Sequence, residues 1–231
     1  MKKENIIRIC PSSTIVIFLM FLSISFKSIE QENTVIVKDI DGNVYKTVRI
    51  GSQTWMAENL KATKYNNGTP IPLATTDTEW SNLSTPGYCW YLNDEATYKN
   101  IYGALYNWYT VNTGKLCPTD WHVPSDSEWT ILTTYLGGES VAGGKMKETG
   151  TIHWIAPNVG ATNTSGFTGL PGGNRLDDGT FGAVGYYGYW VSTTEVDTST
   201  EWGRDLDRGD SKIRRITYPK KNGFSVRCLK D

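Results

Sequence analysis

The sequence predicts an α+β domain in which short strands and two helices are joined by long ordered loops. Strand-like alternation begins at Val35, two later segments have apolar residues at helical spacing, and a Gly- and Asp-rich stretch follows them. No linker, internal repeat or low-complexity tract divides the 231 residues, which are enough to bury a large core. We therefore expect one domain over residues 34–231.

The domain opens with a predicted meander of three strands. The segment TVIVKD (34–39) is followed by Asp41-Gly42, a strong hairpin signal. The segment VYKTVRI (44–50) alternates between two faces until Gly51 interrupts it, and QTWMAENL (53–60) predicts the third strand.

Two helices are predicted in the middle of the chain. Residues 66–87 are polar and rich in proline, which indicates a loop before them. From about 101 to 111, aromatic and aliphatic side chains have the spacing of one buried helical face, and Gly114 ends the segment. The second helix is expected to begin at Ser125, because Ser125 and Glu128 form the S-x-x-E pattern of a capping box.

The second helix accounts for most of the polar residues around its start. Trp129, Leu132, Tyr135 and Leu136 are expected to form its buried face, and Gly137-Gly138 ends the helix. The stretch that follows, up to about Thr200, has too little aliphatic content for regular helices. Its isolated apolar residues between glycines predict short strands joined by ordered loops, which in compact domains are usually functional or stabilised by an ion.

The composition excludes some classes of partner. The formal net charge is −1 and charged residues make up 20%. The chain therefore has no positive electrostatic field that would attract nucleic acid or anionic lipid. No basic stripe or zinc-finger spacing suggests nucleic-acid binding either. The 9 Trp and 13 Tyr predict a core of large rings, and any exposed rings among them would suit sugar stacking.

The first 28 residues resemble a signal peptide. Positive residues precede an apolar run at 14–26, which is shorter than the about 20 residues that a spanning helix needs. Export is therefore the prediction, with no membrane span in the mature chain; an uncleaved anchor is the alternative. Cys10 precedes the apolar run, so it does not form a lipobox.

Export changes the interpretation of the remaining cysteines. Cys89, Cys117 and Cys228 would remain in the mature chain, where two are expected to pair and one to stay free. Their spacing alone does not give the pairing. The chain has only His122 and His153, which excludes a three-histidine metal site, and it lacks a G-x-S-x-G nucleophile elbow. His122 is expected to pack between its neighbours, although its role as a base or ligand stays open.

Four segments together resemble a known family. They are VKDIDGNVYKTVRIGSQTWMAENLK, YGALYNWYTVNTGKLCPTDWHVPSDSEWTIL, GFTGLPGGNRLDDGTFGAVGYYGYWVSTTE and, at the end, KNGFSVRCLKD. In this order they are similar to the Fibrobacter succinogenes major paralogous domain, which occurs in exported, often surface-associated bacterial proteins. The resemblance implies a C-type lectin-like fold, with two helices around a small twisted antiparallel sheet and long ordered loops. It also implies a Cys117–Cys228 disulfide and a free, buried Cys89.

The first functional hypothesis is a non-catalytic binding or adhesion module that is secreted or lies at the cell surface. The segments CWYLND, NRLDDG and EWGRDLDRGD combine rings with amides and charges, which suit a glycan or a protein ligand. The candidate ligand-binding residues are Trp90, Asn93, Asp94, Arg175, Asp177, Asp178, Trp202 and Arg204. Clustered loop acids would suit a structural Ca²⁺, but no cofactor is expected otherwise. The chain lacks the W-N-D triplet of sugar-binding C-type lectins.

Two alternatives belong to other classes. A structural subunit of an extracellular assembly would bury its aromatic residues between neighbouring subunits. An oxidoreductase of the formylglycine-generating kind, which the resemblance also suggests, would need a pair of nearby cysteines for copper. With Cys117 and Cys228 expected in a disulfide, that pair is missing, so we do not expect an enzyme.

Overall fold

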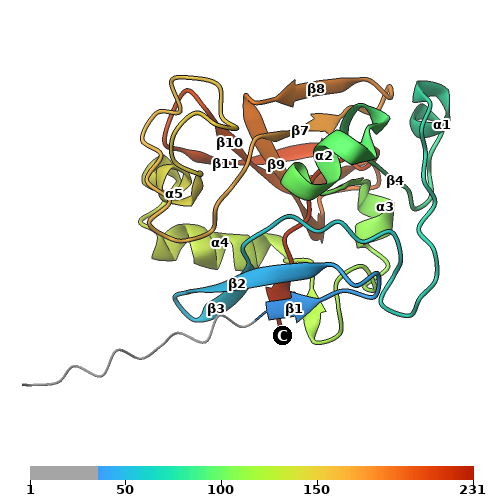
Figure 1. The fold of residues 1–231 in the computed structure, drawn as a ribbon, viewed down its shortest axis with the longest axis horizontal. Coiled ribbons are helices and arrows are strands. Elements are labelled where there is room, and N and C mark those ends of the chain that lie inside the picture. The colour runs from blue at the N-terminus through green and yellow to red at the C-terminus, as the bar shows by residue number, and fades with distance from the viewer. Residues whose placement is uncertain (1–35) are drawn as a thin grey trace, which may run out of the picture. The chain divides into compact units, whose positions relative to one another are not determined.

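Two five-stranded sheets and a two-stranded sheet dominate the structure, a computed structural model that describes residues 36–231 (Figure 1). The predicted signal peptide, residues 1–28, lies outside the described residues. The described residues lie in one compact unit. None of the helices in the described part of the chain is long and apolar enough to cross a membrane.

The elements are short, and strands outnumber helices. The strands are β1 Ile36–Lys38, β2 Val44–Ile50, β3 Gln53–Met56, β4 Tyr88–Cys89, β5 Leu105–Tyr106, β6 Trp121–His122, β7 Gly172–Arg175, β8 Phe181–Val184, β9 Tyr187–Glu195, β10 Thr200–Asp207, β11 Ile213–Pro219 and β12 Leu229–Lys230. The helices are α1 Asp77–Ser81, α2 Glu95–Tyr102, α3 Trp108–Val111, α4 Asp126–Tyr135 and α5 Glu139–Met146, and the 3₁₀ turn η1 covers Tyr91–Asn93.

The first sheet has the order β1-β2-β3-β12-β6 and is antiparallel. Its first three strands form the predicted meander, although β3 ends at Met56 and is shorter than expected. The last strand, β12, lies between β3 and β6, so that Leu229 pairs with both Trp55 and His122. The two ends of the domain are therefore joined in one sheet.

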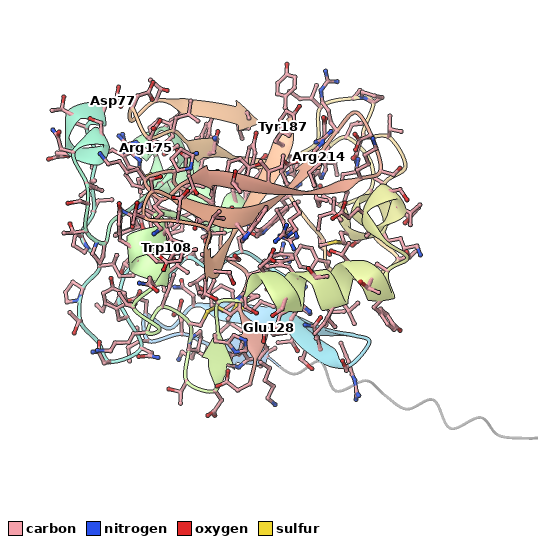
Figure 2. All side chains as sticks on the ribbon, turned by 180° about the vertical axis from the view of Figure 1, so that it is seen from behind. Asp77, Trp108, Glu128, Arg175, Tyr187 and Arg214 are labelled. Carbon is pink, nitrogen blue, oxygen red and sulfur yellow. A yellow bond between two sulfur atoms is a disulfide. The ribbon has the colours of Figure 1, made fainter. Side chains whose placement is uncertain are left out.

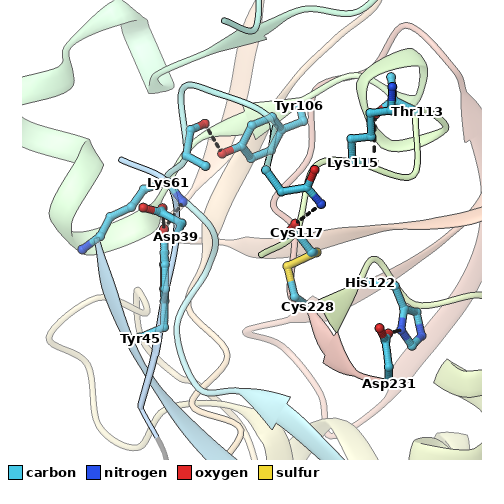
Figure 3. The surroundings of a disulfide bond; sticks show 12 residues. Asp39, Tyr45, Lys61, Tyr106, Thr113, Lys115, Cys117, His122, Cys228 and Asp231 are labelled. Atoms are coloured by element: carbon cyan, nitrogen blue, oxygen red, sulfur yellow. Dashed lines mark hydrogen bonds and ion pairs between the residues drawn. A yellow bond between two sulfur atoms is a disulfide. The ribbon is translucent and has the colours of Figure 1, made fainter. Parts of the chain in front are cut away.

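A disulfide fixes the end of the chain in this sheet. Cys117 and Cys228 are bonded, which confirms the predicted pairing, and Figure 3 shows the bond next to the His122–Asp231 pair. Cys89 is free and buried, as expected. The bridge connects the segment before β6 to the residue before β12, so it holds two neighbouring strands together.

The second sheet has the order β11-β10-β9-β7-β8. It is mixed, because β7 pairs with β9 in parallel while the other pairs are antiparallel. The longest strands of the sheet, β9, β10 and β11, follow one another as a meander. One face of these strands packs against α4 and α5, where Trp190 and Leu206 are fully buried.

The core between the sheets is built from large rings. Trp55 from the first sheet, Trp129 from α4 and Trp190 from the second sheet lie in one buried cluster with Phe167. The ring centroids of Trp55 and Trp129 are 4.7 Å apart. Such contacts add to the burial of the rings by about 0.5–1.5 kcal/mol per pair. The prediction of an aromatic core that includes Trp129 is thus confirmed.

The predicted fold class is wrong. The described chain is mostly β, with two five-stranded sheets and several short helices, and not two helices around one small sheet as in a C-type lectin-like domain. The strands β9, β10 and β11 have 9, 8 and 7 residues, much longer than expected for this glycine-rich region. Their regular pairing with one another, which the local sequence does not reveal, accounts for the difference.

The expected helix at 101–111 is also wrong. Tyr106 and Trp108 are buried, but α2 ends at Tyr102, and its C-cap Gly103 has φ 74°. A side chain there would approach the Leu60 carbonyl to 2.6 Å, so the position requires glycine. Leu105–Tyr106 then forms strand β5, and only Trp108–Val111 is again helical.

Two further helices lie where none was expected. The segment 66–87 contains α1, which Thr76 and Glu79 begin with a complete capping box. The glycine-rich segment after 137 contains α5, in which glycines are needed for packing. A Cβ atom on Gly143 would lie 2.1 Å from the Lys212 carbonyl oxygen. Glycine, although it is a poor helix former, is therefore the residue that permits the contact between α5 and β11.

The second predicted helix is confirmed, except that Tyr135, which was expected on its buried face, is 64% exposed. The helix is α4, which has Ser125 as its N-cap. The Ser125 side chain accepts from the Glu128 backbone amide, and Glu128 Oε2 accepts from the Ser125 amide at 2.8 Å. The backbone amides of Ser125 and Glu128, which have no partner within the helix, thereby donate to side-chain oxygens.

Candidate functional site

The face of the second sheet opposite α4 and α5 is partly covered by α3 and by the buried ring of Phe224. Side chains alternate along β9, β10 and β11, so the residues that do not face the helices gather on the opposite side. We call this surface the tyrosine face; it comprises Tyr187, Tyr189, Asp205, Asp207, Arg214 and Tyr218. Figure 2 shows Tyr187 and Arg214 at one end of the sheet and Trp108, on α3, at the other.

Strand register brings the residues of the tyrosine face into a row. Asp205 lies opposite Tyr189 on β9 and opposite Arg214 on β11. These three side chains therefore come from three neighbouring strands and lie side by side. Tyr187 and Asp207 are paired in the same way one step further along the strands.

The rings of the tyrosine face form a connected layer. Tyr187 and Tyr189 are stacked, with centroids 5.6 Å apart and an interplanar angle of 20°. Tyr189 stacks on the buried Phe224 at 5.3 Å, and Tyr218 meets Tyr189 edge to face at 5.9 Å. The layer is anchored in the core at Phe224, while the tyrosines are only partly buried.

Fixed charges surround the rings. Arg214 donates to Asp205 at 2.9 Å, to Asp207 at 3.0 Å and to Asp210 at 2.7 Å. The Tyr218 hydroxyl donates to the second oxygen of Asp205 at 2.7 Å. The guanidinium is thus held in one orientation by three carboxylates.

Burial and these contacts shift several pKa values. Burial raises the pKa of Asp205 above its usual range, even though Tyr218 and Arg214 oppose the shift. Burial also acts to raise the pKa of Asp207, but hydrogen bonds from Gly209, Arg214 and Tyr187 bring it below the ordinary value. The pKa of Tyr187 is raised, chiefly because its hydroxyl bonds to Asp207.

The arrangement is suited to binding a flat polar molecule. The partly exposed ring of Tyr187 offers an apolar surface, and the partly exposed Asp207, Asp210 and Arg214 offer acceptors and donors in fixed positions. Because Arg214 neutralises part of the acid charge, the surface combines both kinds of polar group. Sequence analysis missed this site, although the alternating segment YYGYW was a usable signal.

Four of the predicted ligand-binding residues have structural roles near α1 and α2. Trp90 is buried, with its ring edge to face against Tyr88. Asn93 donates to the Thr75 carbonyl at 2.5 Å, and Asp94 is the N-cap of α2. Arg175 is fully buried and donates to the Ala74 carbonyl at 2.7 Å, so Asn93 and Arg175 hold the same loop.

Arg175 is the most enclosed of these residues. Its guanidinium lies over the rings of Trp80 and Phe181 at 4.8 and 4.6 Å, and it reaches Asp77 at 3.3 Å. In Figure 2 it points toward Asp77 and α1. These contacts with the rings and with Asp77 explain why Arg175 is buried at this place in the fold.

The other four predicted residues lie in two places. Asp177 and Asp178 are exposed in the turn after β7, where Asp178 accepts from the Thr180 amide at 2.9 Å. Trp202 and Arg204 are on β10, on the side of the sheet opposite the tyrosine face. The eight predicted residues are therefore not gathered in a single site.

Arg204 and Trp202 belong to a charged cluster at the start of α4. Arg204 is buried and donates to Asp126 at 2.8 Å, and Arg215 contacts both oxygens of the same carboxylate at 2.8 Å. The Arg215 guanidinium lies 3.3 Å from the centroid of Trp202. Since Asp126 is in the first turn of α4, the cluster fixes the helix against β10 and β11.

His122 was expected to pack between its neighbours, but it lies between two acids. Its Nδ1 is 2.5 Å from Asp231 and its Nε2 is 2.9 Å from Glu128. Burial acts to lower the pKa of His122, but the bonds to Asp231 and Glu128 raise it above the ordinary value. Both ring nitrogens face carboxylates, which favours the protonated imidazolium.

No group of three or more His, Cys, Asp or Glu side chains is arranged to hold a metal ion within residues 36–231. The Ca²⁺ expectation for the acidic loops stays a prediction. In the tyrosine face, the guanidinium of Arg214 occupies the position between the acids.

A family model describes almost all of the domain. The model of the Fibrobacter succinogenes major domain matches residues 48–230. The chain belongs to the Fibrobacter succinogenes major domain family. Neither the curated proteins nor the solved structures contain a match to it. Every strand of the tyrosine face lies within the matched range of this Fibrobacter succinogenes major domain, as does the disulfide.

Proposed function

We propose that this domain is an exported, non-catalytic binding module of the cell surface and that the tyrosine face binds an extracellular glycan. The observation that carries the proposal is the stacked pair Tyr187–Tyr189 beside Arg214, which three carboxylates hold in place. A pyranose ring has an apolar face that stacks on tyrosine and hydroxyls that bond to carboxylate and guanidinium groups.

The disulfide supports export. Structural disulfides persist in oxidising compartments and are rare in the cytosol, so the Cys117–Cys228 bond indicates a non-cytoplasmic protein. Secretion or display at the cell surface is the finer proposal, and it also rests on the resemblance of residues 1–28 to a signal peptide.

The state of the cysteines supports a binding role over formylglycine-type chemistry. Copper chemistry of that kind needs two nearby thiols. In the described chain Cys117 and Cys228 are joined to each other, and Cys89 is buried with its pKa raised to about 12 by burial. The described chain therefore offers no pair of nearby thiolates that could bind copper.

A glycan array tests the proposal, with Tyr187→Ala compared with its neighbour Tyr186→Ala. Tyr186 is also exposed, but its ring packs under Arg208 at 4.8 Å and lies outside the tyrosine face. We expect a glycan signal that Tyr187→Ala abolishes and Tyr186→Ala retains. Arrays run with and without a Ca²⁺ chelator test the Ca²⁺ expectation in the same experiment.

An array without signal for the wild-type chain would contradict the glycan proposal. A matrix-protein array with a signal that Tyr187→Ala removes would instead assign the face to a protein ligand. Equal signals from both variants would show that glycans bind elsewhere on the domain.

A second candidate function, a structural subunit of an extracellular assembly, is favoured by exposed apolar side chains. Ile152, Ile155 and Val159 are 85%, 44% and 41% exposed on the loop after α5. Burial between subunits would remove this apolar area from water. Analytical ultracentrifugation decides between the two: a monomer at high concentration argues against assembly, and an oligomer that Ile152→Ser dissociates supports it.

A further inference from the structure

A pocket of about 330 Å³ lies at the far end of α4 from the His122 pair. It is bordered by Arg49 near the end of β2, Tyr135 at the end of α4, Lys145 in α5, and the loop residues Thr164 and Ser165. We call it the basic pocket. None of these residues belongs to the tyrosine face, so an activity here goes beyond the proposed function.

The two cations of the basic pocket have no carboxylate partner within residues 36–231. Arg49 donates from Nε to the Gly51 carbonyl at 3.2 Å, and its Nη1 and Nη2 donate to none of the described residues. Lys145 donates to the Leu136 carbonyl at 2.8 Å. By contrast, Arg204, Arg214 and Arg215 are each paired with acids. The Nη1 and Nη2 groups of Arg49 are therefore best placed to donate two parallel hydrogen bonds to an oxyanion.

Groups that suit a sugar surround these cations. The side chain of Tyr135 is 64% exposed at the rim, and its ring packs against Gly51. Thr164 is exposed beside it, and the Ser165 hydroxyl donates to the Lys145 carbonyl at 2.8 Å. An open ring next to a guanidinium and a hydroxyl can contact a sugar ring and its acidic substituent together.

We propose that the basic pocket binds an acidic polysaccharide through the carboxylate or sulfate on its sugar rings. Arg49 would hold the oxyanion by two parallel N–H bonds, Lys145 would add a point charge, and Tyr135 would stack on the ring. Arg49 is exposed in the unbound domain, so pairing it costs little desolvation compared with a buried ion pair. Because the overall charge is −1, the net charge of the chain would not attract an acidic polymer, and binding would depend on local groups such as these.

The experiment measures binding of the full chain to four probes by isothermal titration calorimetry. Polygalacturonate carries carboxylates, dextran sulfate carries sulfates, dextran is neutral, and polyglutamate is an acidic chain without sugar. The variants are Arg49→Gln and Lys145→Gln, and the matched control is Lys115→Gln, which removes an equal charge from an exposed site outside the pocket.

We expect at least one acidic polysaccharide to bind, dextran and polyglutamate not to bind, and the affinity to fall as salt is added. Arg49→Gln should weaken binding about tenfold or more, because it removes both charge-assisted hydrogen bonds to the oxyanion. Arg49→Lys, which keeps the charge but loses the fork, should weaken it less. Lys115→Gln should leave it unchanged, which assigns the weakened binding to the basic pocket and not to the removal of any single positive charge.

Three results would overturn the proposal. If neither acidic polysaccharide binds, or if Lys115→Gln weakens binding as much as Arg49→Gln, the pocket is not an acidic-glycan site. If polyglutamate binds as tightly as the polysaccharides, the pocket takes acidic peptides instead. The relative affinity for polygalacturonate and dextran sulfate identifies the preferred oxyanion once the Arg49 dependence is established.

Discussion

The guanidinium of Arg214 donates a 2.9 Å hydrogen bond to Asp205, whose carboxylate is almost completely buried on the sheet. The two residues lie directly opposite each other on β10 and β11. A buried carboxylate is costly unless it is paired, so this contact stabilises the second sheet and also orients the polar groups of the tyrosine face.

Replacing Arg214 with Gln should therefore destabilise the domain. Asp205 would keep its bond from Tyr218 but lose its cation, which should lower the free energy of unfolding by about 1–3 kcal/mol. Urea unfolding followed by tryptophan fluorescence measures the change. Arg49→Gln is the control, because Arg49 is exposed and unpaired with acids of the described chain, and it should stay within about 0.5 kcal/mol. Equal stabilities of the two variants would contradict this account.

The disulfide should contribute more than any single ion pair. Cys117 and Cys228 are 111 residues apart, and closing a loop of that length restricts the unfolded chain by about 4–5 kcal/mol in the entropic model. The double variant Cys117→Ser, Cys228→Ser should lose about 2–5 kcal/mol, measured by denaturant unfolding. Reductant should destabilise the wild-type chain similarly and leave the double variant unaffected. An unchanged midpoint on reduction would refute the prediction.

Features with a local signal could be predicted from the sequence. The capping box at Ser125 and Glu128 needs only four residues in the right order, and the structure contains it. The same pattern, Thr76 followed by Glu79, marks the start of α1 but lies among prolines that indicated a loop. The signal was present and was outweighed by its context.

Features that depend on contacts between distant residues could not be predicted. The segment 201–210 was a candidate ligand-binding segment without a predicted strand, yet most of it is β10. Its Asp205 meets Tyr189 and Arg214 only through strand register, which a single sequence does not specify. The His122 pair likewise requires β12 to lie beside β6, so that residues 109 positions apart meet.

His122 should make stability depend on pH near neutrality. Its pKa is raised in the folded state by Asp231 and Glu128, against the effect of burial. The folded chain therefore holds this proton more tightly than the unfolded chain, and the stabilisation is full below about pH 6.5. The stabilisation is lost as the pH rises through the raised pKa of His122. Because the imidazole is 37% exposed, we expect a loss of at most about 1 kcal/mol.

The His122→Gln variant isolates this effect. Its free energy of unfolding should change less between pH 5.5 and about 8 than that of the wild-type chain, in parallel urea titrations. His153→Gln is the matched control for the other histidine. Parallel pH profiles of wild type and His122→Gln would show that the pair does not stabilise the fold.

Glu201 is the least satisfied acid of the described residues, and removing it should stabilise the domain. It is fully buried on β10, neither carboxyl oxygen has a hydrogen-bond partner, and Lys220 pairs with Glu195 instead. Burial holds its pKa well above the usual range, so its contribution to stability falls as the pH rises above about 4.3. Glu201→Met, which has a similar volume, should raise the free energy of unfolding at pH 7 by about 1 kcal/mol or more. It should also flatten the decline from pH 4.5 to 7, whereas Glu195→Gln, at an exposed position, should not. A less stable Glu201→Met variant would mean that the carboxyl has a favourable role in this core.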